Sequence, residues 1–131
     1  MINKSALIIE DDDDLATIFA EAVRAAGYEP EIIRDGEVAR ARLTHTQPEV
    51  VILDLHLPHV AGTSLLSQIR ADPRLAGVRV VVATADPRMA EITRPQADIV
   101  LIKPISFSLL RDLTVRLSIA SGKEAGAGSK A

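Results

Sequence analysis

Apolar positions in this chain fall into two patterns, short continuous runs and longer segments in which apolar residues recur every three or four positions. The runs predict strands that are buried on both faces, because such strands present no polar side. They cover residues 6–9, 31–33, 50–53, 78–83 and 99–102. The periodic segments predict helices. They cover about 15–26, 37–44, 63–71, 87–94 and 106–119.

The regular alternation of strand and helix predicts a parallel sheet with helices on both faces. Right-handed crossovers leave few topologies, so we predict an α/β fold with a doubly wound five-stranded parallel sheet of order 2-1-3-4-5, a flavodoxin-like three-layer sandwich. The folded domain is expected to cover residues 1–120. Residues 121–131 are rich in Gly, Ala, Ser and Lys and carry no apolar stripe. They predict a disordered tail or the stub of a linker.

Composition narrows the classes of function. The 131 residues, 47% of them hydrophobic, suit one folded domain. Aromatic residues make up 2% and the net charge is −3, which argues against direct nucleic-acid binding. The absence of cysteine excludes disulfides and thiolate metal sites. No signal peptide and no apolar run of about 18 residues is found, so we expect a cytoplasmic protein without a membrane span.

Charged residues follow three of the predicted strands. Glu10 and Asp11 follow the first, Asp54 ends the third and Lys103 follows the fifth. The carboxyl ends of parallel strands meet at one edge of the sheet, where open α/β folds bind ligands. Clustered carboxylates repel one another, and a hard cation such as Mg²⁺ would compensate them and leave room for a phosphoryl oxygen. A carboxylate can then be the phosphorylated nucleophile, and Thr84, at the end of the fourth strand, is placed to bind the phosphoryl group.

Each of these residues also has an ordinary structural explanation. The acids of 11–14 could form a solvated helix start, which the helix dipole favours. Asp54 could be a turn residue, Lys103 a surface lysine and Thr84 a plain strand-end residue. Their joint occurrence at the ends of neighbouring strands favours a binding site.

These motifs, in this order, resemble the receiver domain of response regulators in two-component signalling. The matching segments are residues 7–12 (LIIEDD), 51–58 (VILDLHLP) with Gly62, 82–85 (VATA) and 102–104 (IKP). The resemblance covers about residues 4–119. It implies a signalling switch, not an enzyme, in which Asp54 accepts a phosphoryl group from a histidine kinase or a phosphotransfer protein. The implied Mg²⁺ ligands are Asp11, Glu10, Asp54 and the main-chain carbonyl of His56. The implied phosphoryl-binding and switch residues are Thr84, Ala85 and Lys103.

The run of acids leaves the metal position open between Asp11 and Asp12. We choose Asp11, because the family's metal-binding acid lies four residues before the first apolar helix position, here Leu15. The family also places two residues beside the path of attacking water, and here these are His56 and Asp86. They are expected to tune how long the phosphoryl group survives, in a direction that the sequence leaves open.

Two departures from the family concern the output. Val100 stands where many receivers carry an aromatic residue that moves on phosphorylation. The fourth helix is short, because Pro95 interrupts it. We therefore expect a non-standard coupling to a downstream effector that the sequence does not identify, with phosphorylation-dependent homodimerisation as one possible output.

Two other functions remain open from the sequence. The first is a phosphorylation-independent interaction module with a receiver fold, which Val100 and the short helix favour. The second is a phosphatase or related hydrolase with an aspartate nucleophile and His56 as its acid. The chain leaves no room for the substrate-selecting cap domain that such enzymes usually need.

Overall fold

The computed structural model describes residues 4–130, with side chains as far as Ile119. Within this range, five strands form one parallel sheet in the order β2-β1-β3-β4-β5, which confirms the predicted doubly wound topology. The strands are β1 (Lys4–Ile9), β2 (Tyr28–Ile33), β3 (Val50–Asp54), β4 (Arg79–Thr84) and β5 (Ile99–Ile102).

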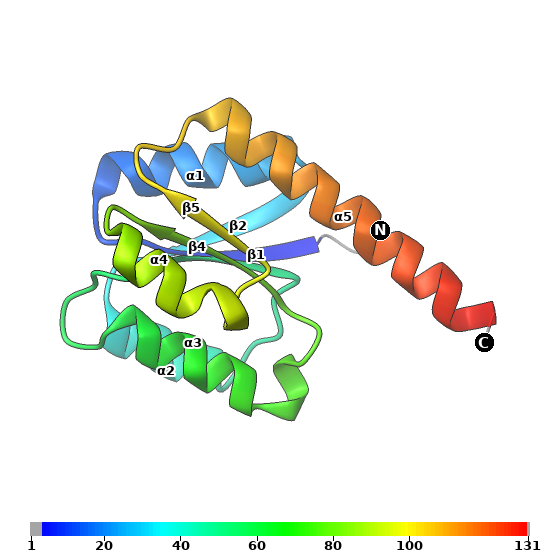
Figure 1. Cartoon of the computed structure of the whole chain (residues 1–131), viewed down its shortest axis with the longest axis horizontal. Helices are drawn as coiled ribbons and strands as arrows, with labels where there is room; N and C mark the ends of the chain where they lie inside the picture. The colour runs from blue at the N-terminus through cyan, green and yellow to red at the C-terminus, as the bar shows by residue number, and fades with distance from the viewer. Residues whose placement is uncertain (1–3, 131) are drawn as a thin grey trace.

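Helices cover both faces of the sheet. They are α1 (Asp13–Ala25), α2 (Gly36–Leu43), α3 (Gly62–Ala71), α4 (Pro87–Thr93) and α5 (Phe107–Lys130), with the 3₁₀ turns η1 (Pro73–Leu75) and η2 (Arg94–Gln96). Figure 1 shows α1 and α5 on one face and α2, α3 and α4 on the other. Among the described residues, no helix is both long enough and apolar enough to cross a membrane.

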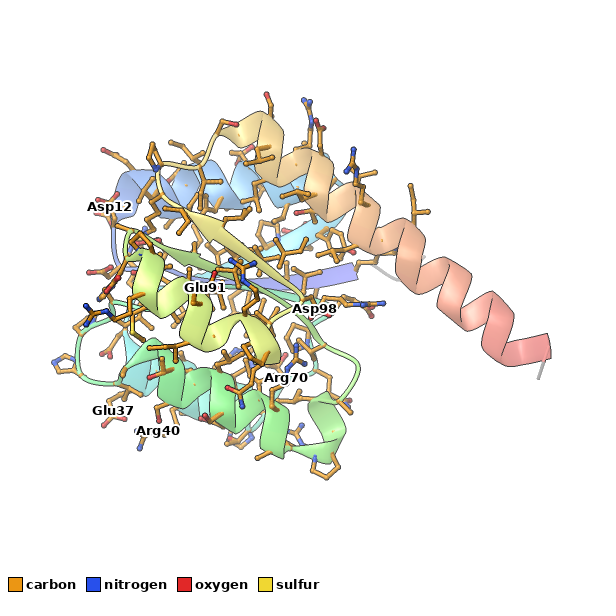
Figure 2. The ribbon with its side chains drawn as sticks, in the orientation of Figure 1. Asp12, Glu37, Arg40, Arg70, Glu91 and Asp98 are labelled. Carbon is orange, nitrogen blue, oxygen red and sulfur yellow. The ribbon has the colours of Figure 1, made fainter. Side chains whose placement is uncertain are left out.

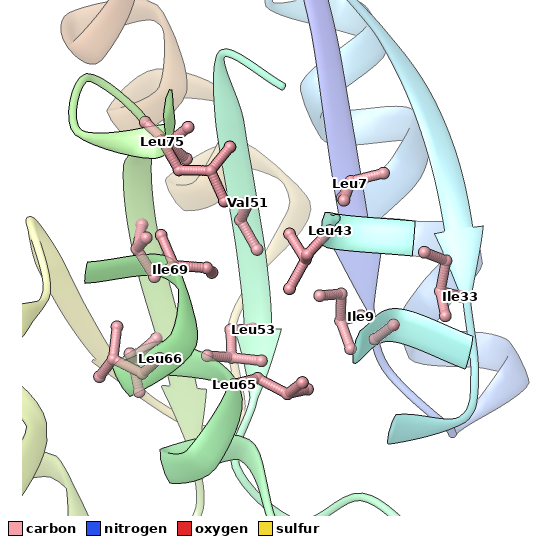
Figure 3. Close-up of a cluster of buried hydrophobic side chains, with 14 of the residues drawn as sticks. Leu7, Ile9, Ile33, Leu43, Val51, Leu53, Leu65, Leu66, Ile69 and Leu75 are labelled. Carbon is pink, nitrogen blue, oxygen red and sulfur yellow. The ribbon is translucent and has the colours of Figure 1, made fainter. Parts of the chain in front are cut away.

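Two apolar clusters, one on each side of the sheet, hold these layers together. The cluster beneath α2 and α3 includes Leu53, Leu65 and Ile69, all fully buried (Figure 3). The cluster beneath α1 and α5 includes Phe19 and Leu110. Each fully buried side chain of this size contributes about 2 kcal/mol of hydrophobic stabilisation. The core therefore relies on aliphatic residues, as the low aromatic content requires.

Some boundaries differ from the sequence prediction. The strand β2 begins at Tyr28 and includes Pro30, which an edge strand tolerates because one of its sides needs no hydrogen bonds. The helix α4 has only seven residues, as its predicted truncation implies, and η2 contains Pro95. The backbone of α5 stays helical through Lys130, beyond the predicted end near residue 119. The division into a domain and a tail stays a prediction, and residue 131 lies outside the described residues.

The connection between α4 and β5 is fixed by Arg70 and Asp98, which lie side by side in Figure 2. Asp98 Oδ2 accepts hydrogen bonds from the Val80 N–H at 2.7 Å and from Arg70 Nη2 at 2.9 Å. Arg70 Nε donates to the Gln96 carbonyl at 2.7 Å. These bonds anchor the start of β5 to β4 and α3, and β5 leads directly to Lys103.

Candidate functional site

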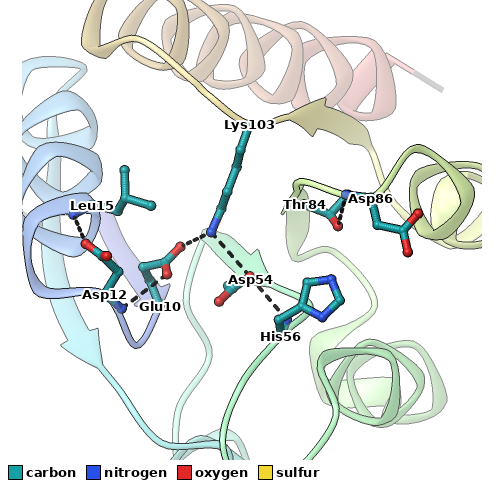
Figure 4. Close-up of polar contacts among 8 residues, drawn as sticks. All are labelled: Glu10, Asp12, Leu15, Asp54, His56, Thr84, Asp86 and Lys103. Carbon is teal, nitrogen blue, oxygen red and sulfur yellow. Dashed lines mark hydrogen bonds and ion pairs between the residues drawn. The ribbon is translucent and has the colours of Figure 1, made fainter.

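The neighbouring strands β1, β3 and β4 end at the same edge of the sheet. Ile9 pairs with Leu53 across β1 and β3, and Asp54 pairs with Ala83 across β3 and β4. The residue that follows β1, Glu10, therefore lies beside the last residue of β3 (Figure 4). Glu10 and Asp54 are 1% and 2% exposed. Two carboxyl groups are thus buried together at the carboxyl edge of the sheet.

A third carboxyl group completes an acidic cluster. One oxygen from each of Glu10, Asp11 and Asp54 lies within 4.8 Å of the others. Three carboxylates without sulfur or imidazole form a donor set that suits a hard cation such as Mg²⁺. Asp12 has a different contact, because its Oδ1 accepts a hydrogen bond from the Leu15 N–H at 2.9 Å and so caps α1.

Lys103 reaches into the same cluster from the end of β5. Its Nζ lies 2.9 Å from Glu10 Oε1 and 3.4 Å from Asp54 Oδ1 (Figure 4). Only 18% of the Lys103 side chain is exposed, so water screens these ion pairs weakly. The ammonium group therefore supplies the positive charge that partly compensates the two buried acids.

Burial dominates the protonation behaviour of the cluster. It raises the pKa of Glu10 to about 7, and the hydrogen bond from Lys103 offsets this only in part. Burial also raises the pKa of Asp54, against the hydrogen bond from the His56 N–H and the charge of Lys103. Burial lowers the pKa of Lys103, but its contacts with the two carboxylates outweigh this and raise it. A bound cation would favour the ionised form of both acids.

The loop of residues 55–61 packs closely against the end of β3. The His56 N–H donates to Asp54 Oδ1 at 3.2 Å, and the Gly62 N–H donates to the Leu55 carbonyl at 3.2 Å. A Cβ atom at Gly62 would lie 2.5 Å from both Asp54 O and Leu55 Cα, so no side chain fits there. The loop is therefore held against the candidate phosphoacceptor.

The predicted switch residue Thr84 follows Ala83, which pairs with Asp54 across β3 and β4. Thr84 is fully buried, and its hydroxyl accepts a hydrogen bond from the Asp86 N–H at 3.1 Å. The Asp86 carboxylate caps α4 by accepting from the Arg88 N–H at 2.9 Å. The side chains of Ala85 and His56 are exposed, and Val100 packs half-buried against the core. Among the described residues, then, the acids and Lys103 are in contact, while the Thr84 hydroxyl binds the loop that leads to α4.

Sequence reasoning missed a contact on the far side of the loop. His59 Nδ1 lies 3.1 Å from Asp35 Oδ1, and Gly36 packs against Val60. The only local signal was Asp35-Gly36 immediately before a predicted helix, which is a common helix-start pattern. The contact across 24 positions could not be seen in the sequence.

Residues 6–114 match the family model of the response regulator receiver domain, and the chain belongs to this family. Its members are signalling switches of two-component systems and are generally not classed as enzymes. The sensory transduction protein RegX3 of Mycobacterium tuberculosis is 34% identical over 116 residues, 86% of this chain and 48% of RegX3. The chain therefore spans about half the length of this relative.

Two solved structures share the fold. The signal receiver domain of a signal transduction histidine kinase from Syntrophus aciditrophicus is 28% identical, with a TM-score of 0.77 over 87% of this chain and 89% of that chain. The receiver domain of sensor histidine kinase PA1611 from Pseudomonas aeruginosa PAO1 has a TM-score of 0.77 at 22% identity, over 88% of this chain and 98% of that chain. In PA1611 a magnesium ion is coordinated in the active site cleft.

Proposed function

We propose that this protein is the phosphoacceptor switch of a two-component phosphorelay, in which Asp54 receives a phosphoryl group from a histidine kinase or a phosphotransfer protein. The observation that carries this proposal is the set of three carboxylates within 4.8 Å of one another, with Lys103 Nζ in contact with two of them. The receiver family gives this set its context.

The proposed cofactor is Mg²⁺, held by Glu10, Asp11, Asp54 and the main-chain carbonyl of His56. The acidic donor set supports this assignment, and the magnesium ion of the PA1611 receiver domain lends it weight. When bound, Mg²⁺ supplies positive charge against the negative charge of the phosphoryl group. Asp12 is not included, because its carboxylate caps α1.

The proposed reaction transfers one phosphoryl group from an imidazole nitrogen of the donor to a carboxylate oxygen of Asp54. A carboxylate oxygen of Asp54 forms a bond to phosphorus while the bond from phosphorus to the donor's imidazole nitrogen breaks. Lys103 Nζ, 3.4 Å from Asp54 Oδ1, is close enough to bind a phosphoryl oxygen. Thr84 and Ala85 are proposed to bind the remaining oxygens, which requires the Thr84 hydroxyl to donate toward Asp54.

The proposed partners are a histidine kinase or phosphotransfer protein and a downstream effector, in the cytoplasm. We further propose that His56 and Asp86 tune the lifetime of the phosphoryl group, since the His56 N–H binds Asp54 Oδ1 and the Asp86 N–H binds the hydroxyl of Thr84 (Figure 4). The output differs from receivers with an aromatic switch, because Val100 offers only a small aliphatic side chain.

Intact mass spectrometry tests the proposal. The protein is incubated with Mg²⁺ and acetyl phosphate beside the variant Asp54→Asn, and circular dichroism checks that both are folded. We expect one added phosphoryl group on the wild type and none on the variant. A folded wild type that gains no mass and fails to bind beryllofluoride would contradict the proposal and favour a phosphorylation-independent interaction module.

A further inference from the structure

The loop of residues 55–61 connects Asp54 to α3 and rests on the start of α2. Its first residues bear directly on the proposed site, because the His56 N–H binds Asp54 Oδ1 at 3.2 Å. The same loop would supply the His56 carbonyl to Mg²⁺. Its far end, around residues 58–60, contacts Asp35 and Gly36 at the beginning of α2. We call this contact, made by Asp35, Gly36 and residues 58–60, the α2 seat.

Gly36 leaves the space that the loop occupies. A Cβ atom at Gly36 would lie 2.7 Å from Val60 Cβ and 2.8 Å from Val60 O. The Gly36 N–H also donates to the Pro58 carbonyl at 3.3 Å. Gly36 does not have a positive φ, since Gly27 is the glycine with one among the described residues. Close approach of the loop, and not backbone conformation, therefore explains glycine at this position.

A second contact of the α2 seat joins the side chains of Asp35 and His59. Asp35 Oδ1 lies 3.1 Å from His59 Nδ1 and also accepts the Glu37 N–H at 2.9 Å, as the cap of α2. His59 has φ 71°, a left-handed conformation that non-glycine residues rarely adopt. Glu37, the next acid on α2, is paired with Arg40 at 3.8 Å. The contact with Asp35 thus helps to hold His59 in a conformation that its backbone alone disfavours.

We propose that Asp35, Gly36 and His59 are positioning residues, which hold the loop so that the His56 N–H and carbonyl face Asp54 and the Mg²⁺ site. None of the three touches the reacting groups; each acts through the loop. Val60, 5% exposed, connects the seat to the apolar core, so a shift at Gly36 cannot be absorbed by solvent. This inference rests on the proposed function of the Asp54 site.

The decisive variant is Gly36→Ala, with Gly77→Ala as its matched control. A Cβ atom at Gly77 meets nothing within 4 Å, whereas one at Gly36 must displace Val60. The overlap is expected to lower stability to the modest extent typical of overpacking, which the better helix propensity of alanine offsets in part, so we expect Gly36→Ala to fold with a displaced loop. We expect its Mg²⁺ affinity, measured by titration calorimetry, to fall about tenfold, which is the lower range for residues that support metal ligands. The rate of phosphorylation by acetyl phosphate should recover at saturating Mg²⁺.

Two conservative variants test the other side of the seat. Asp35→Asn keeps a good helix cap, and His59→Asn keeps a residue that tolerates positive φ, so both preserve the backbone. Each should weaken Mg²⁺ binding by up to about fivefold, because the contact is exposed. The double variant should lose less than the sum of the two single losses, since both changes weaken the same contact.

The outcomes separate the two proposals. If folded Gly36→Ala and Gly77→Ala bind Mg²⁺ as tightly as the wild type, the α2 seat has no positioning role and the proposed function stands. If Gly36→Ala lowers thermal stability without changing half-saturating Mg²⁺, its role is only structural. If Gly36→Ala does not fold, the two asparagine variants decide. If the wild type binds no Mg²⁺ and accepts no phosphoryl group, the proposed function itself fails.

Discussion

Glu10 allows a quantitative test of the electrostatics of the pocket. The carboxyl group is 1% exposed, and its pKa rises from the ordinary 4.5 to about 7. Each pKa unit corresponds to about 1.4 kcal/mol, so ionising Glu10 costs about 3 kcal/mol more in the folded protein than in the unfolded chain. Between the two pKa values the folded protein binds more protons than the unfolded chain. The free energy of unfolding should therefore fall as pH rises from 4.5 to about 7 and stay low above that range.

Replacing the titrating group should remove this loss. The free energy of unfolding of Glu10→Gln, relative to that of the wild type, should rise by about 3 kcal/mol from about pH 4 to pH 8. Both are measured in metal-free buffer by urea denaturation with circular dichroism. At about pH 8, Mg²⁺ at one hundred times its dissociation constant for the wild type should raise the free energy of unfolding of the wild type by about 2.7 kcal/mol. The same Mg²⁺ concentration should raise that of the variant far less. Circular dichroism is the signal of choice because the chain contains no tryptophan for fluorescence.

Glu91→Gln is the matched control. The Glu91 side chain is 72% exposed and pairs with Arg94 on the surface of α4, so its replacement should change the free energy of unfolding by less than about 0.5 kcal/mol at any pH. The reasoning fails if metal-free wild type is equally stable from about pH 5 to pH 8, or if Glu10→Gln loses as much stability as the wild type over that range.

Three further predictions concern the same architecture. Lys103→Met leaves two buried carboxylates without their ammonium partner and should lower the free energy of unfolding by about 3 kcal/mol near neutral pH, as measured by urea denaturation. An unchanged free energy of unfolding would mean that the ion pairs contribute nothing to stability. Leu65→Ala should cost about 3 kcal/mol in the same assay at every pH, because it leaves a cavity in a fully buried cluster. Asp11→Asn should weaken Mg²⁺ binding in calorimetry while Asp12→Asn leaves it unchanged, and equal effects would undo the assignment of Asp11 to the metal.

The sequence contained enough information to predict the topology, because a buried parallel strand is a continuous apolar run and right-handed crossovers leave few orders. It was less informative wherever the local signal conflicted with tertiary context. The strand β2 begins at Tyr28 although Pro30 interrupts its pattern, since pairing with β1 on one side is enough. The helical backbone of 120–130 likewise has no apolar periodicity that could have predicted it.

The candidate site was predictable as a set of residues but not as a geometry. Placing Glu10, Asp54 and Lys103 at strand ends was enough to expect them together, because parallel strands end at the same edge. The hydrogen bond between the Thr84 hydroxyl and the Asp86 N–H depends on a side-chain rotamer and a loop conformation, neither of which has a sequence pattern. The contact between Asp35 and His59 joins two loops, and periodicity carries no information about such pairs.

The ion pair between Lys103 and Glu10 joins residues 93 positions apart, and this separation has a consequence for biosynthesis. A chain made from its N-terminus exposes Glu10, which follows β1, and Asp54 of β3 well before Lys103 leaves the ribosome. Until β5 joins the edge of the sheet, those carboxyl groups lack the ammonium group of Lys103, and closing the pocket around them without a bound cation is unfavourable near neutral pH. The pocket is therefore among the last parts of the domain to form, and a chain truncated before β5 would lack a competent site.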